Sequence, residues 1–179
     1  MFLLFTPIVF YSAAKAEKGR KAMFCIGEKV CYPMHGIGEI SGIEQRTVLG
    51  STAEYYVLKF ASSRVNAMVP ISAAQSVGLR RPITREEGEK VLSYIKRGES
   101  GAEAAWGSNW NRRYRENCDR LKKGEIYAVA DVFLCLNARQ NEKGLSAGEI
   151  KMLALTRRLI KDELIYAGCD EKEVVSAIG

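Results

Sequence analysis

The sequence has a single histidine, His35, among its 179 residues. Its cysteines are odd in number and show no CxxC spacing; they are Cys25, Cys31, Cys118, Cys135 and Cys169. A zinc site of the usual Cys and His pattern cannot be assembled from them, and a secreted disulfide framework is not indicated. We interpret them as reduced, mostly buried side chains of a cytoplasmic protein, and we expect no bound metal.

Motifs that bind nucleotide phosphates or activate a nucleophile are also missing. There is no GxxxxGK[ST] segment, and the GxG formed by Gly36 and Gly38 lacks the third glycine and the helix of a dinucleotide site. A nucleophile needs a base and an orienting group, and His35 lies in a turn-like Pro-Met-His-Gly context. Acids such as Glu116 follow bases such as Arg112 at helical spacing, as on a solvated helix face. We therefore expect no enzyme, no cofactor and no small-molecule substrate.

The apolar run at residues 2–14 is too short to cross a bilayer as a helix. Its basic residues follow the run, whereas in a signal peptide they precede it. We therefore favour Met23 as the natural start and interpret residues 1–22 as an extension outside the fold. A signal peptide and a membrane-proximal anchor are the alternatives. We expect no membrane partner.

Positive charge is present but local. The formal net charge is +6, which favours an acidic partner. Residues 23–79 contain four bases and four acids, so this part is neutral. Residues 108–123 carry six bases and two acids. An acidic partner is therefore expected at the second of these segments.

Residues 23–79 are predicted to form a small β domain. Four segments have strand character: EKVCYP, GIGEISGIEQRTV, AEYYVLKF and RVNAMVP, the last beginning at Arg64. The glycines set among Ile37, Ile40 and Ile43 indicate a bent strand with a bulge. So few residues with four or five strands can only make a curved sheet closed on itself, like a Tudor or SH3 barrel.

From Thr84 onward the sequence has helical periodicity. Capping boxes start helices at Thr84 and Ser146, and glycines end them. Helices are expected over residues 84–98, 109–123, 125–142, 146–167 and 170–177. The packed face of the fourth is expected to contain Ile150, Leu153, Ala154, Arg157 and Leu164. The fold class is thus α+β: a β domain (23–79), a connecting helix (80–98), a linker (99–107) and a helical bundle (108–179).

The segment SNWNRRYR, residues 108–115, carries the strongest functional signal. Arginines can fork onto phosphates while an aromatic ring wedges between bases, so Trp110, Arg112, Arg113 and Arg115 are candidate DNA-binding residues. An alternative stays open for the tryptophan.

In that alternative the tryptophan belongs to the protein core. Trp110, Tyr114, Cys118 and Leu121 recur at the spacing of a buried helical stripe. The arginines would then lie on an ordinary solvated face.

Residues 23–168 resemble the CarD family of bacterial transcription regulators. Three segments carry the resemblance: VCYPMHG at 30–36, NWNRRY at 109–114 and KGLSAGEIKML at 143–153. The resemblance implies a Tudor-like domain that binds the β subunit of RNA polymerase, a domain type also found in the transcription-repair coupling factor. It implies a helical domain whose tryptophan, here Trp110, enters the minor groove of promoter DNA at the upstream bubble edge. The implied result is a stabilised open promoter complex.

The resemblance also implies polymerase contacts on the exposed strands of the β domain. We expect these at Arg46, Arg64, Val65 and Ala67. The family's arginine before the Val-Pro of the fourth strand is replaced here by Met68, for which Arg64 is a candidate substitute. A second tryptophan, Trp106, lies in the linker and is expected to pack there.

A second function remains open. A β barrel joined to a helical bundle could act as an adaptor that binds protein only, with Trp110 buried. The salt dependence of binding distinguishes the two functions, because binding to DNA phosphates weakens steeply as the salt concentration rises.

Overall fold

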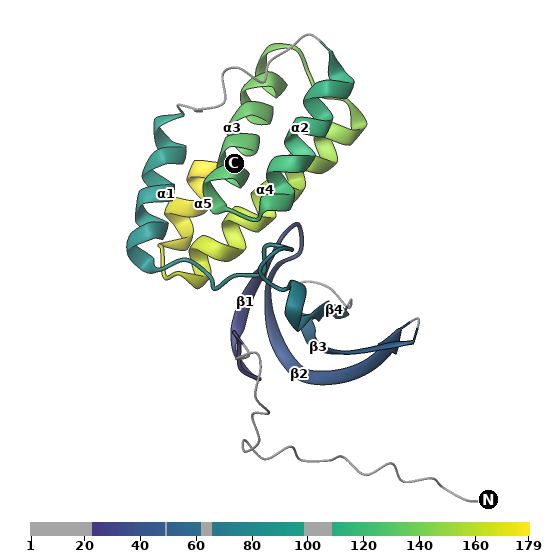
Figure 1. Ribbon diagram of the computed structural model, residues 1–179. Helices are drawn as coiled ribbons and strands as arrows, with labels where there is room; N and C mark the ends of the chain where they lie inside the picture. The colour runs from purple at the N-terminus through teal and green to yellow at the C-terminus, as the bar shows by residue number, and fades with distance from the viewer. Residues whose placement is uncertain (1–22, 49, 62–65, 99–108) are drawn as a thin grey trace, which may run out of the picture.

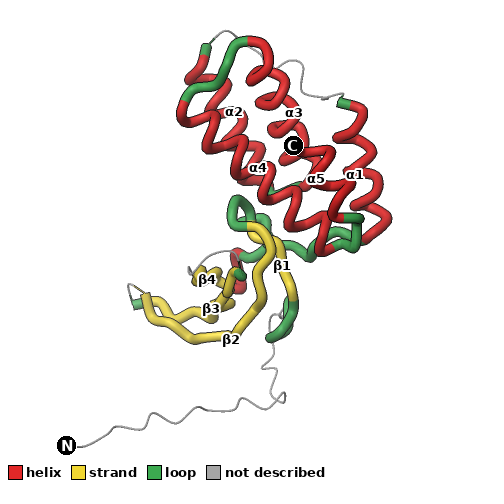
Figure 2. Tube along the Cα trace, turned by 180° about the vertical axis from the view of Figure 1, so that it is seen from behind, coloured by secondary structure: helices red, strands yellow, loops and turns green. Residues whose placement is uncertain are grey.

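The β-rich part of the chain forms one antiparallel sheet in the computed structural model, which describes residues 23–48, 50–61, 66–98 and 109–179. Its strands, in sheet order, are β1 (Lys29–Tyr32), β2 (Gly36–Val48), β3 (Ser51–Phe60) and β4 (Asn66–Pro70). The predicted bulge is present, since the register shifts between Ile40 and Gly42. Figure 2 shows β2 and β3 curving away from the helices. The expected α+β fold is confirmed.

The concave side of the sheet holds the first hydrophobic core. Side chains from all four strands are buried in it, among them Val30, Ile40, Tyr56, Leu58 and Val69. The sheet is a meander, and within the described residues β1 does not pair with β4. Instead the chain passes through the short helix η1 (Ile71–Ala73) and returns to the free edge of β1. There Cys31 and Arg80 form an antiparallel bridge.

Five α-helices follow, close to the ranges that capping and glycine signals predict. They are α1 (Arg85–Arg97), α2 (Trp110–Lys123), α3 (Ile126–Glu142), α4 (Ala147–Tyr166) and α5 (Glu171–Ile178). Both predicted capping boxes are formed, from Thr84 to Glu87 and from Ser146 to Glu149. Figure 1 shows the helices gathered at one end of the molecule, with the sheet at the other.

The helical core includes α1, which the sequence predicts only as a connection. Val91, Leu92 and Ile95 of α1 are buried among the side chains of α3 and α4. The helix therefore contributes to the helical domain in addition to linking it to the sheet.

The predicted packed face of α4 is partly wrong. Ile150 is 55% exposed and Ala154 is exposed as well, whereas Leu153 and Leu164 are buried. The buried face instead includes two carboxylates, Glu149 and Glu163, each paired with an arginine. Because these buried acids interrupt the apolar pattern, the periodicity of apolar residues predicts the buried face of α4 only in part.

Arg80 connects the two domains. Its guanidinium donates to both carboxylate oxygens of Glu163 on α4, at 2.5 and 2.9 Å. Its Nε donates to the carbonyl of Gly124 at 2.7 Å. Gly124 has φ +73°, and a Cβ there would lie 2.7 Å from Cγ of Pro33, so only glycine lets the β1–β2 turn approach. The domains therefore meet through specific polar and close-packed contacts.

Among the helices of the described ranges, none is long and apolar enough to cross a membrane.

Candidate nucleic-acid interface

Trp110 begins α2 and is accessible at its surface. The helix is capped by Asn109, whose side-chain oxygen accepts the backbone N–H groups of Asn111 and Arg112. The indole of Trp110 is 43% exposed and stacks on Tyr114, with ring centroids 5.5 Å apart and planes 24° apart. One aromatic face is thus supported by protein while the other part of the ring faces outward.

The alternative of a fully buried stripe is correct only toward the end of the helix. Leu121 is fully buried, and Tyr114 and Cys118 are partly buried against the helical core. Trp110 lies at the exposed end of this stripe. It is therefore not a core tryptophan.

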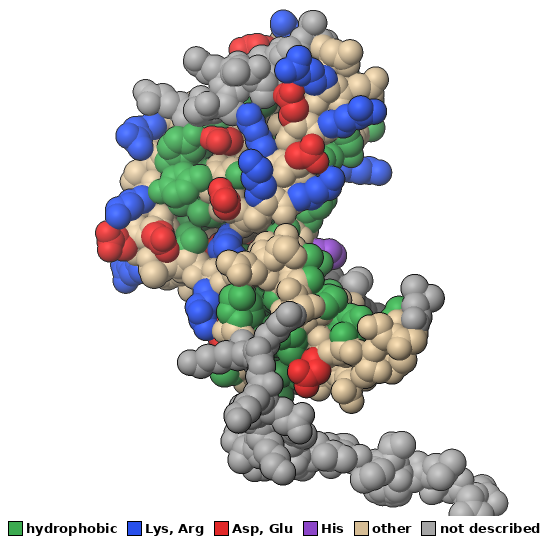
Figure 3. Space-filling view, viewed as in Figure 1, with side chains coloured by type: hydrophobic (Ala, Val, Ile, Leu, Met, Phe, Trp, Pro, Cys, Tyr) green, Lys and Arg blue, Asp and Glu red, His purple; other side chains and the backbone are tan. Residues whose placement is uncertain are grey.

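The three neighbouring arginines have different surroundings. Arg112 is exposed and donates to Glu116 at 2.8 Å, the pair expected from the sequence. Arg115 is also exposed, and among the described residues it forms no ion pair within 4.0 Å. Figure 3 shows Lys and Arg side chains on the helical domain, interspersed with acids.

Arg113 corrects the sequence expectation of a phosphate contact. Its side chain is only 3% exposed, and its Nε and Nη2 both donate to Oε1 of Glu149, at 3.0 and 2.9 Å. Helical geometry turns this position toward α4, where a carboxylate neutralises the guanidinium. Arg113 therefore joins two helices and does not face a DNA backbone.

Glu149 links the arginine to the helix cap. Its second oxygen, Oε2, accepts the hydroxyl and the backbone N–H of Ser146, at 2.7 and 3.0 Å. Burial raises the pKa of Glu149, but the hydrogen bonds from Ser146 and Arg113 outweigh it and hold that pKa below its usual value. The carboxylate is therefore ionised at neutral pH.

The sequence indicates Ser146 only as a helix cap. In the structure its hydroxyl also accepts the indole N–H of Trp110 at 2.8 Å. No local signal could reveal this contact, because the two residues are 36 positions apart. The sequence likewise indicates Glu149 only as the partner of Ser146 in a capping box.

The candidate polymerase-binding residues lie on the β domain, as far as they are described. Arg46 is exposed on β2 and pairs with Glu44 at 2.6 Å. Ala67 lies on β4, which pairs with β3 and with no other strand of the described ranges. Met68, next to it, is 41% exposed. Arg64 and Val65 lie outside the described residues, as do Trp106 and residues 1–22.

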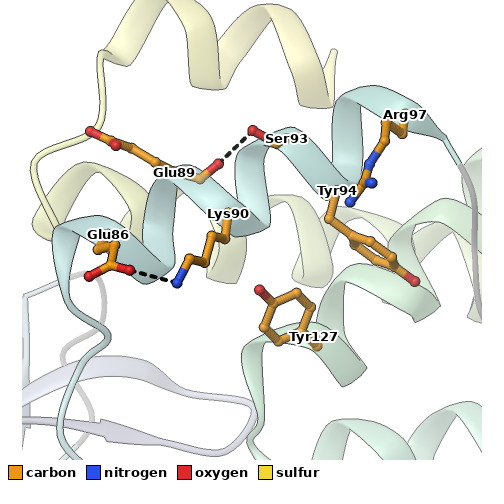
Figure 4. Close-up of a pocket in the computed structure, with 7 residues that line it drawn as sticks. All are labelled: Glu86, Glu89, Lys90, Ser93, Tyr94, Arg97 and Tyr127. Carbon is orange, nitrogen blue, oxygen red and sulfur yellow. Dashed lines mark hydrogen bonds and ion pairs between the residues drawn. The ribbon is translucent and has the colours of Figure 1, made fainter.

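A groove of about 670 Å³ lies along α1 beside Tyr127 of α3 (Figure 4). Lys90 pairs with Glu86 in it, and the hydroxyl of Ser93 donates to the carbonyl of Glu89. The serine is thus engaged by its own helix. His35 lies in the other domain, with its ring stacked at 5.2 Å on Tyr32. The described residues contain no cluster of three or more His, Cys, Asp or Glu side chains that could hold a metal.

Comparison with known proteins covers both domains. Residues 24–83 match the model of the CarD-like/TRCF RID domain, and residues 90–178 match the CarD C-terminal domain. The chain is also 36% identical over 156 residues to a Bacillus subtilis (strain 168) protein named "Putative transcription factor YdeB". That alignment covers 86% of this chain and 99% of the relative.

Proposed function

The chain belongs to the CarD family of transcription-associated proteins, and we propose that it binds RNA polymerase and promoter DNA at the same time. Its β domain would contact the polymerase β subunit. Its helical domain would contact the minor groove at the upstream edge of the bubble and stabilise the open complex. The observation that carries this proposal is Trp110, a half-exposed aromatic ring at a helix start beside exposed arginines.

Trp110 and the exposed arginines beside it would contact different parts of the DNA. The ring supplies an apolar wedge, while Arg112 and Arg115 supply positive charge for the adjacent phosphates. Unstacking a base step costs a few kcal/mol, which an inserted aromatic ring can offset. Arg113 takes no part in this contact, because its guanidinium is buried against Glu149.

The polymerase contact is proposed for the free edge of β4 and for Arg46 of β2. An edge strand offers unpaired backbone N–H and C=O groups, so a partner strand can extend the sheet. This mode of binding needs little charge and suits the neutral β domain. Exposed Met68 would add apolar contact where the family pattern has an arginine. Arg64 and Val65, which precede β4 in the sequence and lie outside the described residues, remain candidates.

The decisive experiment measures open-complex lifetime with the Trp110→Ala variant. We expect a roughly tenfold shorter lifetime if the ring contributes about 1.4 kcal/mol against collapse of the bubble. Polymerase binding should be unchanged. The fold should be nearly unaffected, since the loss of about 3–5 kcal/mol applies to buried aromatic residues and this one is half exposed.

Two outcomes would contradict the proposal. An unchanged lifetime with normal polymerase binding would favour the protein-only adaptor. A large loss of folding stability would mean that a shortened lifetime reports unfolding. Chemical denaturation of the same variant separates these outcomes.

A further inference from the structure

The hydrogen bond between Trp110 and Ser146 belongs to a closed network at the start of α4. Oγ of Ser146 accepts the indole N–H at 2.8 Å and the backbone N–H of Glu149 at 3.4 Å, and it donates to Oε2 of Glu149 at 2.7 Å. A serine hydroxyl has one hydrogen and two lone pairs. All three are therefore used.

Glu149 determines which of these groups donates and which accepts each hydrogen bond. An ionised carboxylate can only accept hydrogen bonds, so the hydroxyl hydrogen of Ser146 points to Glu149 and a lone pair is left for the indole. Arg113 holds the other carboxylate oxygen from α2, the helix that carries Trp110. Because Glu149 is only 2% exposed, water cannot readily replace these partners.

Gly148 supports the same tryptophan through Tyr114. The ring of Tyr114 stacks on Trp110 and lies against Gly148, where an added Cβ would be 3.2 Å from Cε2 of the tyrosine. That distance is shorter than an ordinary van der Waals contact. A side chain at position 148 would therefore push the tyrosine, and with it the stacked indole, outward.

We propose that the first turn of α4 is a positioning platform for Trp110, formed by Ser146, Gly148 and Glu149. This inference rests on the proposed function of Trp110 and extends it to a segment 36 residues away. An indole ring that is already fixed in the free protein loses less conformational freedom when it enters DNA. Since its N–H is already bonded within the protein, the indole meets DNA with its apolar edge. It would then select base steps that open easily rather than a particular hydrogen-bonding base edge.

The first test replaces Ser146 with glycine, which removes the acceptor but remains acceptable at a helix N-cap. The matched control is Thr84→Gly, because Thr84 caps α1 with the same type of capping box and does not contact Trp110. Both changes are made in a Trp106→Phe background, so that all tryptophan emission comes from Trp110.

We expect Ser146→Gly to raise acrylamide quenching of Trp110 and to lower its fluorescence anisotropy. The rise should be roughly twofold, since losing one hydrogen bond of ordinary strength frees other rotamers of the ring. Thr84→Gly should change neither value. Gly148→Ala leaves the capping box intact and should change the quenching and the anisotropy in the same directions as Ser146→Gly. Ser146→Thr keeps the hydroxyl and should restore the parental values. Equal quenching in Ser146→Gly and the Trp106→Phe parent would overturn the platform.

The second test is a double-mutant cycle on open-complex lifetime. Ser146→Gly should shorten the lifetime severalfold when Trp110 is present and should have no further effect in Trp110→Ala. Equal shortening in both backgrounds would mean that Ser146 acts on the fold alone, and the platform would be rejected. If Trp110→Ala itself leaves the lifetime unchanged, the proposed DNA contact fails. The fluorescence measurements would then still decide whether the platform holds the ring.

Discussion

Arg80 and Glu163 join the two domains through two parallel hydrogen bonds, from Nη1 to Oε1 at 2.5 Å and from Nη2 to Oε2 at 2.9 Å. Such a fork fixes orientation as well as distance. The same guanidinium holds the carbonyl of Gly124 at the end of α2. One side chain thus ties the strand-edge segment after η1 to two helices.

Arg80→Ala is expected to reduce the free energy of unfolding by about 3 kcal/mol, because Glu163, only 5% exposed, would lose its partner. Urea denaturation measures this loss. Arg85→Ala is the control, since its ion pair with Glu89 is exposed and should contribute little. Similar losses in the two variants would show that the domain junction has no special role in stability.

Arg113 and Arg115 should respond in opposite ways to replacement by alanine. Arg113→Ala should cost about 3 kcal/mol of folding stability, because buried Glu149 loses its hydrogen-bonded ion-pair partner and keeps only Arg139, whose Nε lies 3.9 Å from Oε1. Arg115→Ala should leave stability nearly unchanged. It should flatten the slope of log affinity for DNA against log salt by about 0.9 if it neutralises one phosphate. Denaturation curves and a salt titration measure the two effects, and a salt slope in Arg115→Ala that equals the parent's would remove this residue from the interface.

The stability of the helical domain should fall in acid because of Glu149. The folded-state pKa of this carboxyl lies below the usual 4.5, so its contribution is present above pH 4.5 and is lost as pH falls through the folded pKa. Glu149→Gln should therefore lose less stability than the parent between pH 5 and the acid limit of folding. Thermal unfolding across this range tests the expectation. Glu142→Gln, at the exposed end of α3, is the control and should follow the parent closely.

The cysteines should differ strongly in reactivity. Burial, followed by the nearby Glu163 carboxylate, raises the pKa of Cys31 to about 12, so its thiol stays protonated at neutral pH. Burial also raises the pKa of Cys135 and of Cys169. Cys25 is exposed and should be modified first by a thiol reagent at pH 8. Peptide mapping identifies the modified residue, and Cys25→Ser should abolish the fast phase; fast labelling of Cys31 would contradict the packing at the domain junction.

Local signals predicted the element boundaries well. The Ser146 and Glu149 pair marked the start of α4, and Gly124 marked the end of α2, because caps and left-handed turns depend on neighbouring residues. The glycines near Ile40 likewise predicted the bulge in β2. These features need no knowledge of distant parts of the chain.

The candidate site was less predictable, since its key contacts join residues 36 positions apart. The run of arginines could not reveal that Arg113 points inward, because its partner Glu149 lies on another helix. Spacing placed Trp110 on a core stripe, and only the packing of α2 against α4 leaves that end of the stripe exposed. Burial of the neighbouring Glu149 also explains why Ile150, which the sequence predicts on the packed face, is exposed.

The contacts made by Arg80 have a consequence for avidity. In the proposed complex, the β domain and the helical domain keep a fixed orientation to each other. Once one domain has bound its target, the other is therefore held near its own target at a high effective concentration. A flexible junction would let the unbound domain sample a larger volume. The combined binding would then be weaker, although the contacts of each domain with its target would not change. The affinity of each separate contact can then be low, and the protein can still remain on a promoter that polymerase occupies while leaving free DNA readily.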